Sequence, residues 1–155
     1  MSAVLKISTP SFRPMTEADL SVIMEIENCA YSHPWTTAIF QDCLRVGYCC
    51  WVLELDEAIT GYCVMSVGAG ECHLLNLCIV PELQNNSYGA LLLDHMLEIA
   101  RSHHVDTAFL EVRPSNKYAI KLYFRAGFDE VGMRRDYYPA HFGREDALIL
   151  ARSLL

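Results

Sequence analysis

The sequence has few basic residues and no long apolar run. Lys and Arg together number 12 against 19 Asp and Glu, so the formal net charge is −7. Nonspecific nucleic-acid binding needs a surplus of cations to neutralise phosphates, so we expect no nucleic-acid partner; the excess of acids suits a basic substrate or serves solubility alone. No apolar stretch reaches the roughly 18 residues that span a bilayer, and no charged leader precedes an apolar segment. We therefore expect neither a membrane partner nor a secretory signal.

Cysteine occurs seven times but never in the C-x-x-C spacing of zinc and redox sites. The positions are Cys29, Cys43, Cys49, Cys50, Cys63, Cys72 and Cys78. An odd count without metal-ligand spacing is typical of reduced, mostly buried thiols. We therefore predict a cytoplasmic protein without a metal site, with a reactive thiol or metal binding as the alternatives.

No internal repeat, low-complexity tract or linker interrupts the 155 residues, of which 52% are hydrophobic. This predicts a single domain over residues 1–155 with one core. Apolar periodicity and turn residues predict the order β-α-α-β-β-β-α-β-α-β-β. The expected elements are a strand at 4–12, a helix that begins near Thr16, a helix capped by Thr36 or Thr37 that runs to Leu44, strands at 48–55, 58–67 and 72–80, a helix at 87–104, a strand at 107–112, a helix at 115–126 that Ser115 caps and Gly127 ends, and strands at 128–135 and 147–155.

This order indicates an α/β protein with a mixed sheet and helices on its faces. The run Cys72–Val80 is almost continuously apolar, as expected of a central strand covered on both faces. The segment 147–155 could equally be helical.

The central strand leads through a short polar loop directly into a long helix. Unpaired backbone N–H groups and the helix dipole make such a junction an anion site that suits a pyrophosphate. A polar loop with one glycine is also common at ordinary helix starts, so the loop alone leaves both interpretations open.

Two residues stand out in the segment LEVRPSNKYAIKLYFRAGF, residues 110–128. Glu111 interrupts an apolar strand, where a buried carboxylate must be paired or used, for example as a general base. An ion pair with Arg113 or an outward-facing position is the structural alternative. Tyr123 shares a helical face with Ala119 and should point toward the sheet, either as a core aromatic or as a functional hydroxyl.

The chain resembles the GNAT superfamily of N-acetyltransferases, and within it the bacterial ribosomal-protein-alanine N-acetyltransferases. The order of elements, the loop before the long helix and the segment 110–128 carry this resemblance, which covers nearly the whole chain. Further matching strings are HPWT from His33, NLCIVP from Asn76, RRDYYP from Arg134 and GREDA from Gly143.

The resemblance implies a GNAT fold, with a central, mostly antiparallel sheet, splayed strands and flanking helices. It implies acetyl-CoA as co-substrate and the N-terminal α-amine of a protein as acceptor, with an alanine-starting ribosomal protein as the inferred target. Another protein N-terminus, a lysine or a small amine is the alternative acceptor. A module that binds acetyl-CoA without catalysis is a further alternative.

The resemblance also implies roles for particular residues. Glu111 matches the general base, and Tyr123 matches the general acid that protonates the departing thiolate. The implied cofactor contacts are Leu77, Cys78, Ile79, Asn85, Asn86, Ser87, Tyr88, Gly89, Ala90 and Asn116. The acceptor groove is assigned to Trp35, Tyr138, Glu145 and Asp146, although Trp35 could equally anchor the core. Because the amine attacks the thioester directly, no cysteine nucleophile is required.

The loop departs from the family pattern at two positions. Ser87 stands where the first glycine is expected, and Asn85 stands where an arginine is common. A Cβ at Ser87 obstructs the backbone approach if this position needs a positive φ, although Ser87 could instead cap the helix. The missing cation removes a charge-assisted hydrogen bond worth about 1.5 to 3 kcal/mol. We therefore expect acetyl-CoA to bind more weakly than in a loop that follows the pattern.

Overall fold

A computed structural model describes residues 9–155 of the chain, and the elements there follow the predicted order. They are β1 (Pro10–Pro14), α1 (Leu20–Ala30), α2 (Thr37–Arg45), β2 (Cys49–Leu55), β3 (Ala58–Gly68), β4 (Glu71–Ile79), α3 (Tyr88–Ser102), β5 (Thr107–Val112), α4 (Lys117–Arg125), β6 (Asp129–Pro139) and β7 (Arg144–Ser153). Short 3-10 turns at Glu17–Asp19 and Pro81–Leu83 lie before α1 and after β4. The strand predicted at 4–12 falls partly outside the described residues.

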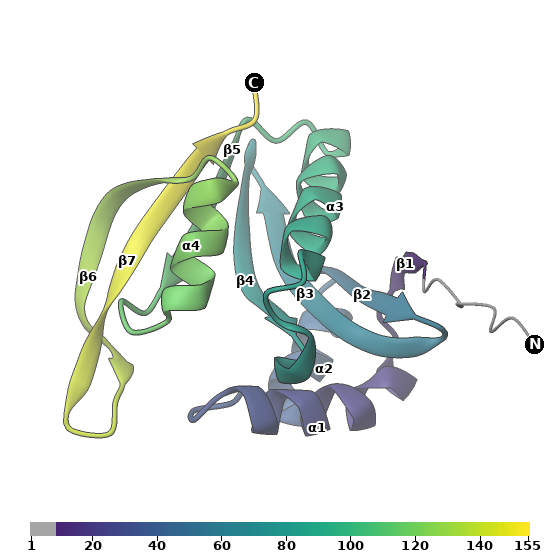
Figure 1. Ribbon diagram of the computed structural model, residues 1–155. Coiled ribbons are helices and arrows are strands. Elements are labelled where there is room, and N and C mark those ends of the chain that lie inside the picture. The colour runs from purple at the N-terminus through teal and green to yellow at the C-terminus, as the bar shows by residue number, and fades with distance from the viewer. Residues whose placement is uncertain (1–8) are drawn as a thin grey trace, which may run out of the picture.

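Seven strands form one sheet in the order β1-β2-β3-β4-β5-β7-β6. Among the strands of residues 9–155, β4 and β5 are the one pair that runs parallel, so the predicted mixed, mostly antiparallel sheet is confirmed. Helices α3 and α4 lie on one face, and α1 and α2 lie on the other (Figure 1). Side chains of a strand alternate between faces, so Leu53 and Cys63 pack toward α3 while Val52 and Tyr62 pack toward α1 and α2.

The prediction that β4 is covered on both faces is wrong for its first half. Cys72 and Leu74 are buried, but His73 and Leu75 on the opposite face are exposed. The reason is that α1 packs on β3 and α2 on β2, so neither helix extends over the start of β4. An apolar strip of sheet is thereby left open.

Strands β4 and β5 separate along their length, as the family resemblance implies. Their pairing runs only from Glu71 opposite Thr107 to Leu74 opposite Leu110. Beyond Leu74, β4 continues to Ile79 with β3 as its partner. The sheet therefore has a gap in its middle, bounded by the second half of β4 and the end of β5.

The ends of α4 differ in part from the prediction. Asn116, not Ser115, caps the helix, because its Oδ1 accepts the N–H of Ala119 at 3.2 Å. The hydroxyl of Ser115 instead donates to Glu145 at 2.9 Å. At the other end, Gly127 has a φ of +90° and stops the helix as predicted.

The segment that could have been helical is a strand, because β7 has two partners. It pairs with β5 on one side and with β6 on the other. Strand β6 extends four residues past the predicted end at Arg135, to Pro139, and so forms a long hairpin with β7. In Figure 1 this hairpin stands at one side of the molecule, beyond α4.

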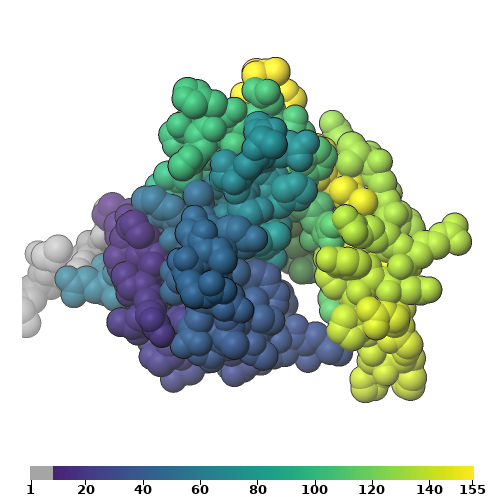
Figure 2. Space-filling view, turned by 180° about the vertical axis from the view of Figure 1, so that it is seen from behind, coloured from purple at the N-terminus to yellow at the C-terminus, as the bar shows by residue number. Residues whose placement is uncertain are grey.

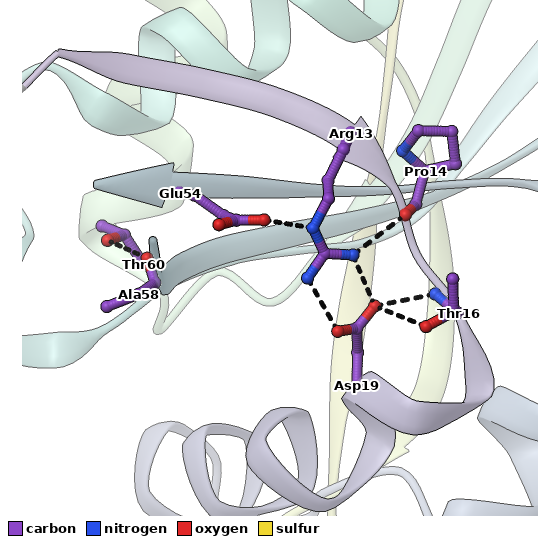
Figure 3. A network of polar contacts seen from close by, with 7 residues as sticks. All are labelled: Arg13, Pro14, Thr16, Asp19, Glu54, Ala58 and Thr60. Atoms are coloured by element: carbon purple, nitrogen blue, oxygen red, sulfur yellow. Dashed lines mark hydrogen bonds and ion pairs between the residues drawn. The ribbon is translucent and has the colours of Figure 1, made fainter. Parts of the chain in front are cut away.

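Arg13 ties β1 to β2 and to the start of α1 (Figure 3). Its guanidinium donates to both oxygens of Asp19 at 2.8 Å and to Glu54. Asp19 also accepts the N–H of Thr16 at 2.8 Å, which confirms the helix start predicted there. The hydrogen bonds from Arg13 lower the pKa of Asp19 to about 2.

We expect the free energy of unfolding of the Asp19→Asn variant to depend less on pH in the acid range than that of the wild type. Because the pKa of Asp19 is lower in the folded chain, its stabilisation is present above about pH 4 and is lost as the pH falls through about 2. The variant should be less stable by about 1 kcal/mol at pH 7 and should converge with the wild type only below about pH 2. Urea unfolding at several pH values measures this, with the exposed Asp129→Asn as control. A constant difference at every pH would contradict the prediction.

Candidate active site

The edge of β4 that faces the gap presents backbone groups of alternate residues. The hydroxyl of Tyr31 donates to the carbonyl of Leu77 at 3.1 Å, and the Gln84 side chain donates to the carbonyl of Ile79 at 3.1 Å. Backbone groups alternate between the two edges of a strand, so the N–H groups of Leu77 and Ile79 also point into the gap. Cys78 pairs with Tyr62 of β3, is buried in the core on the α1 and α2 face, and also lines a cavity beside β4.

The loop between β4 and α3 adopts a conformation that glycine favours. Ser87 precedes α3 with a φ of 68°, in the left-handed region, and Asn85 has a φ of 64°. The expectation that Ser87 could cap α3 is not met, because its side chain makes no capping hydrogen bond. A capping serine needs an extended backbone to aim its hydroxyl at the first turn, and the left-handed conformation turns it away.

A cavity of about 480 Å³ opens beside this loop. Among the residues that line it are Asn85, Ser87, Gly89 and Ala90. Asn86 and Tyr88 do not line it: the Asn86 side chain donates back to two loop carbonyls, and Tyr88 packs against the core. The sequence-predicted loop residues are thus together, but only part of them faces the cavity.

Tyr123 lies at the junction between two cavities. It comes from α4, is 7% exposed, and lines both the narrow cavity along β4 and a wider groove of about 430 Å³. Asn116 also lines both. Burial raises the pKa of Tyr123 well above its usual value, so the hydroxyl keeps its proton at neutral pH.

Glu111 lies near the end of β5 and lines the wider groove together with Tyr123. The prediction of a buried carboxylate or an ion pair with Arg113 is wrong: the side chain is 26% exposed, and its Oε1 lies 2.9 Å from Nε of Arg134. Arg113 bonds instead to the carbonyl of Pro139 at 2.7 Å. The carboxylate of Glu111 also raises the pKa of Tyr137 through a hydrogen bond, so it touches a tyrosine that the sequence did not single out.

The wider groove has aromatic walls. Trp35 and Tyr138, which were assigned to the acceptor groove from the sequence, both line it, and Tyr137 adds a further ring. Trp35 also packs on Phe40 with a ring distance of 5.2 Å, so it serves the core and the groove together. Figure 2 shows this face, where the groove lies between the blue N-terminal helices and the yellow-green β6–β7 hairpin.

Glu145 and Asp146 lie near the start of β7, beside the turn of the hairpin, and are not among the groove-lining residues. Glu145 accepts hydrogen bonds from the Ser115 backbone at 3.0 Å and from Arg113 at 3.3 Å. Asp146 accepts the N–H of Asp136 at 2.9 Å. Glu145 thus joins the hairpin to the turn before α4, and Asp146 joins the two strands of the hairpin.

Glu27 is a groove residue that the sequence reasoning missed. It is 1% exposed, and its carboxylate accepts from the Tyr62 hydroxyl at 2.6 Å, from the Asn76 amide at 3.1 Å and from the backbone N–H of Trp35 at 2.9 Å. The signal was its position four residues after Ile23, on the buried stripe of α1. This carboxylate therefore positions one wall of the groove.

All seven cysteines are free thiols, five of them buried. Burial raises the pKa of Cys63 well above its usual value, which makes it a poor nucleophile. Within residues 9–155 no three His, Cys, Asp or Glu side chains gather as metal ligands do. No helix in the same part of the chain is long and apolar enough to cross a membrane.

A model of the acetyltransferase (GNAT) family matches residues 20–128. The chain is 34% identical over 137 residues to the ribosomal protein bS18-alanine N-acetyltransferase of Salmonella typhimurium, and the matched region covers 88% of this chain and 93% of that protein. It is 35% identical over 133 residues to the protein of the same name from Escherichia coli K12, covering 86% and 90%. The crystal structure of the ribosomal-protein-S18-alanine N-acetyltransferase from Escherichia coli has a TM-score of 0.87 at 32% identity, with 94% of each chain covered. The chain therefore belongs to the acetyltransferase (GNAT) family and is an N-acetyltransferase.

Proposed function

We propose that this enzyme transfers the acetyl group of acetyl-CoA to the N-terminal α-amine of a protein that begins with alanine, and that the protein is ribosomal, as the names of its relatives state for them. The observation that carries the proposal is the gap between β4 and β5. Tyr123 lines cavities on both sides of this gap, one along the β4 edge and one that also contains Glu111. Donor and acceptor can thus approach one tyrosine from opposite faces of the sheet.

The residues on the α3 and α4 side suit acetyl-CoA. The inward N–H groups of β4 match the amides of a pantetheine arm, and the cavity at the start of α3 suits a pyrophosphate. When bound, acetyl-CoA supplies an activated acetyl thioester. Leu77, Ile79 and the loop then orient this group with its carbonyl near Tyr123.

Glu111 accepts the proton of the acceptor ammonium, directly or through one water. An α-amine has a pKa near 8, so roughly a tenth is already unprotonated at pH 7, whereas a lysine amine near 10.4 is less than about 0.1% unprotonated. A carboxylate that is 26% exposed therefore suffices for an N-terminal amine. The open aromatic groove leaves room for the residues that follow the first one.

Tyr123 donates a hydrogen bond to the departing thiolate. A thiol has an ordinary pKa near 8.5 and a tyrosine near 10, so full proton transfer is uphill by about 2 kcal/mol. Burial of Tyr123 raises its pKa further and makes this transfer more uphill. Tyr123 therefore acts through a strong hydrogen bond or a late proton transfer.

A peptide panel tests the choice of acceptor. Peptides with a free N-terminal alanine should gain one acetyl group on the α-amine, read by mass spectrometry, and N-terminally blocked peptides with an internal lysine should gain none. Acetylation of the blocked peptides would replace the proposal with lysine transfer. Binding of acetyl-CoA without thiol release on any amine would favour a binding module instead.

Glu111→Gln should lower kcat/KM for an alanine peptide about tenfold at pH 7, and the deficit should shrink to below about twofold above pH 9. The reason is that the acceptor is already deprotonated at high pH and no longer needs Glu111. A pH series of initial rates measures this, with the exposed Glu130→Gln as control. A deficit that stays constant with pH would assign Glu111 a positioning role through its ion pair with Arg134.

A further inference from the structure

The cofactor loop of this enzyme contains no cation. Residues 81–90 read PELQNNSYGA, and the one charged side chain among them is that of Glu82. Backbone N–H groups and the helix dipole at the start of α3 attract an anion, but they supply only about half an elementary charge. A ligand with several phosphate charges would be incompletely neutralised by the loop alone.

Two cations on another element line the same cavity as the loop. Helix α4 contributes Tyr118, Lys121 and Arg125 to the lining of the 480 Å³ cavity beside the loop. Lys121 and Arg125 are four residues apart and therefore share one face of α4. Within residues 9–155, neither cation forms an ion pair with a carboxylate. Both cations therefore line the same cavity as Gly89, Ala90 and Asp94 of α3.

Tyr118 fixes the position of α4 relative to the loop. Its hydroxyl accepts the backbone N–H of Asn85 and lies so close to Gly89 that a Cβ there would come within 2.7 Å of it. Burial raises the pKa of Tyr118, so the hydroxyl keeps a proton that it can donate to a phosphate oxygen. With a rise of about 1.5 Å per residue, Lys121 lies roughly one turn beyond Tyr118 and Arg125 roughly 10 Å beyond it.

We infer that Lys121 and Arg125 hold the phosphates of acetyl-CoA in place of the cation that the loop lacks, Lys121 at the pyrophosphate and Arg125 at the more distant 3′-phosphate. The inference rests on the proposed use of acetyl-CoA. Asp94 also lines this cavity, and its carboxylate opposes the bound phosphates. The net affinity is therefore set by two cations and one anion, all on α3 and α4.

Isothermal titration with CoA and with 3′-dephospho-CoA tests the assignment without turnover. Arg125→Gln should weaken CoA about fivefold and leave 3′-dephospho-CoA within about twofold of wild type, whereas Lys121→Gln should weaken both ligands about fivefold. Asp94→Asn should tighten CoA severalfold. Lys117→Gln is the matched control, because Lys117 is an exposed cation on the same helix that does not line the cavity.

A second experiment tests whether a cation in the loop can replace Lys121. Asn85→Arg in the Lys121→Gln background returns a cation to the loop and should restore CoA affinity to within about twofold of wild type. If the wild type binds CoA and the Lys121 and Arg125 variants bind it equally well, this inference is overturned and the proposed function stands. If the wild type binds neither ligand, the proposed use of acetyl-CoA fails, and this inference fails with it.

Discussion

Tyr123→Phe is expected to lower kcat about 100-fold while the KM for acetyl-CoA changes by less than about threefold. Phenylalanine keeps the buried ring and its edge contact with Phe128, whose centroid lies 5.8 Å away, so the fold and the cavity walls are retained. The variant loses only the hydroxyl that lies where the two cavities meet. Initial rates of thiol release measure kcat. Tyr48→Phe is the control, because Tyr48 has an exposed ring and is far from Tyr123 in the sequence.

The pH profile adds an independent readout. A general acid must be protonated, and burial keeps the pKa of Tyr123 well above its usual value of 10. Activity should therefore not fall between pH 8 and pH 10 through ionisation of this residue. A Tyr123→Phe enzyme with wild-type kcat would show that the thiolate departs without help from this hydroxyl.

Much of the fold could be predicted from the sequence because its signals are local. Apolar periodicity, the Thr36 cap and Gly127 each act within a few residues, and they placed the elements in the correct order. The cap of α4 shows where local signals end, because Ser115 was predicted and Asn116 is the residue that caps the helix. Both residues can cap, and the choice is made by Glu145, 30 residues further along the chain, which engages Ser115.

The candidate site shows the same division between local and tertiary signals. The residues alone singled out Glu111 and Tyr123 but left a structural and a functional interpretation open for each, and only the family resemblance assigned them roles. The comparisons establish the family and not these roles, which stay predictions. The partner of Glu111 could not be found in the sequence, because the local candidate Arg113 lies two residues away while Arg134 comes from β6. Strand β7 lies between β5 and β6, so this ion pair reaches across one intervening strand.

Glu27→Gln is expected to lower the free energy of unfolding by about 3 kcal/mol. Three donors converge on the Glu27 carboxylate, from Tyr62, Asn76 and the backbone of Trp35, and all lie within 3.1 Å of it. A carboxylate can accept from all three, whereas the amide nitrogen of Gln is itself a donor and leaves at least one buried group unpaired. Urea unfolding measures the loss, and Glu25→Gln, exposed on the same helix, should change it by less than about 0.5 kcal/mol.

The same variant links stability to function, because one of the three donors is the backbone of a groove residue. Releasing the Trp35 N–H frees the wall that Trp35 forms, so the KM for the acceptor peptide should rise severalfold while acetyl-CoA binding is unchanged. Tyr62→Phe in the Glu27→Gln background removes one of the donors, so the double variant should lose less stability than the sum of the two single losses. Strict additivity, or a Glu27→Gln enzyme as stable as the wild type, would show that these donors do not depend on the carboxylate.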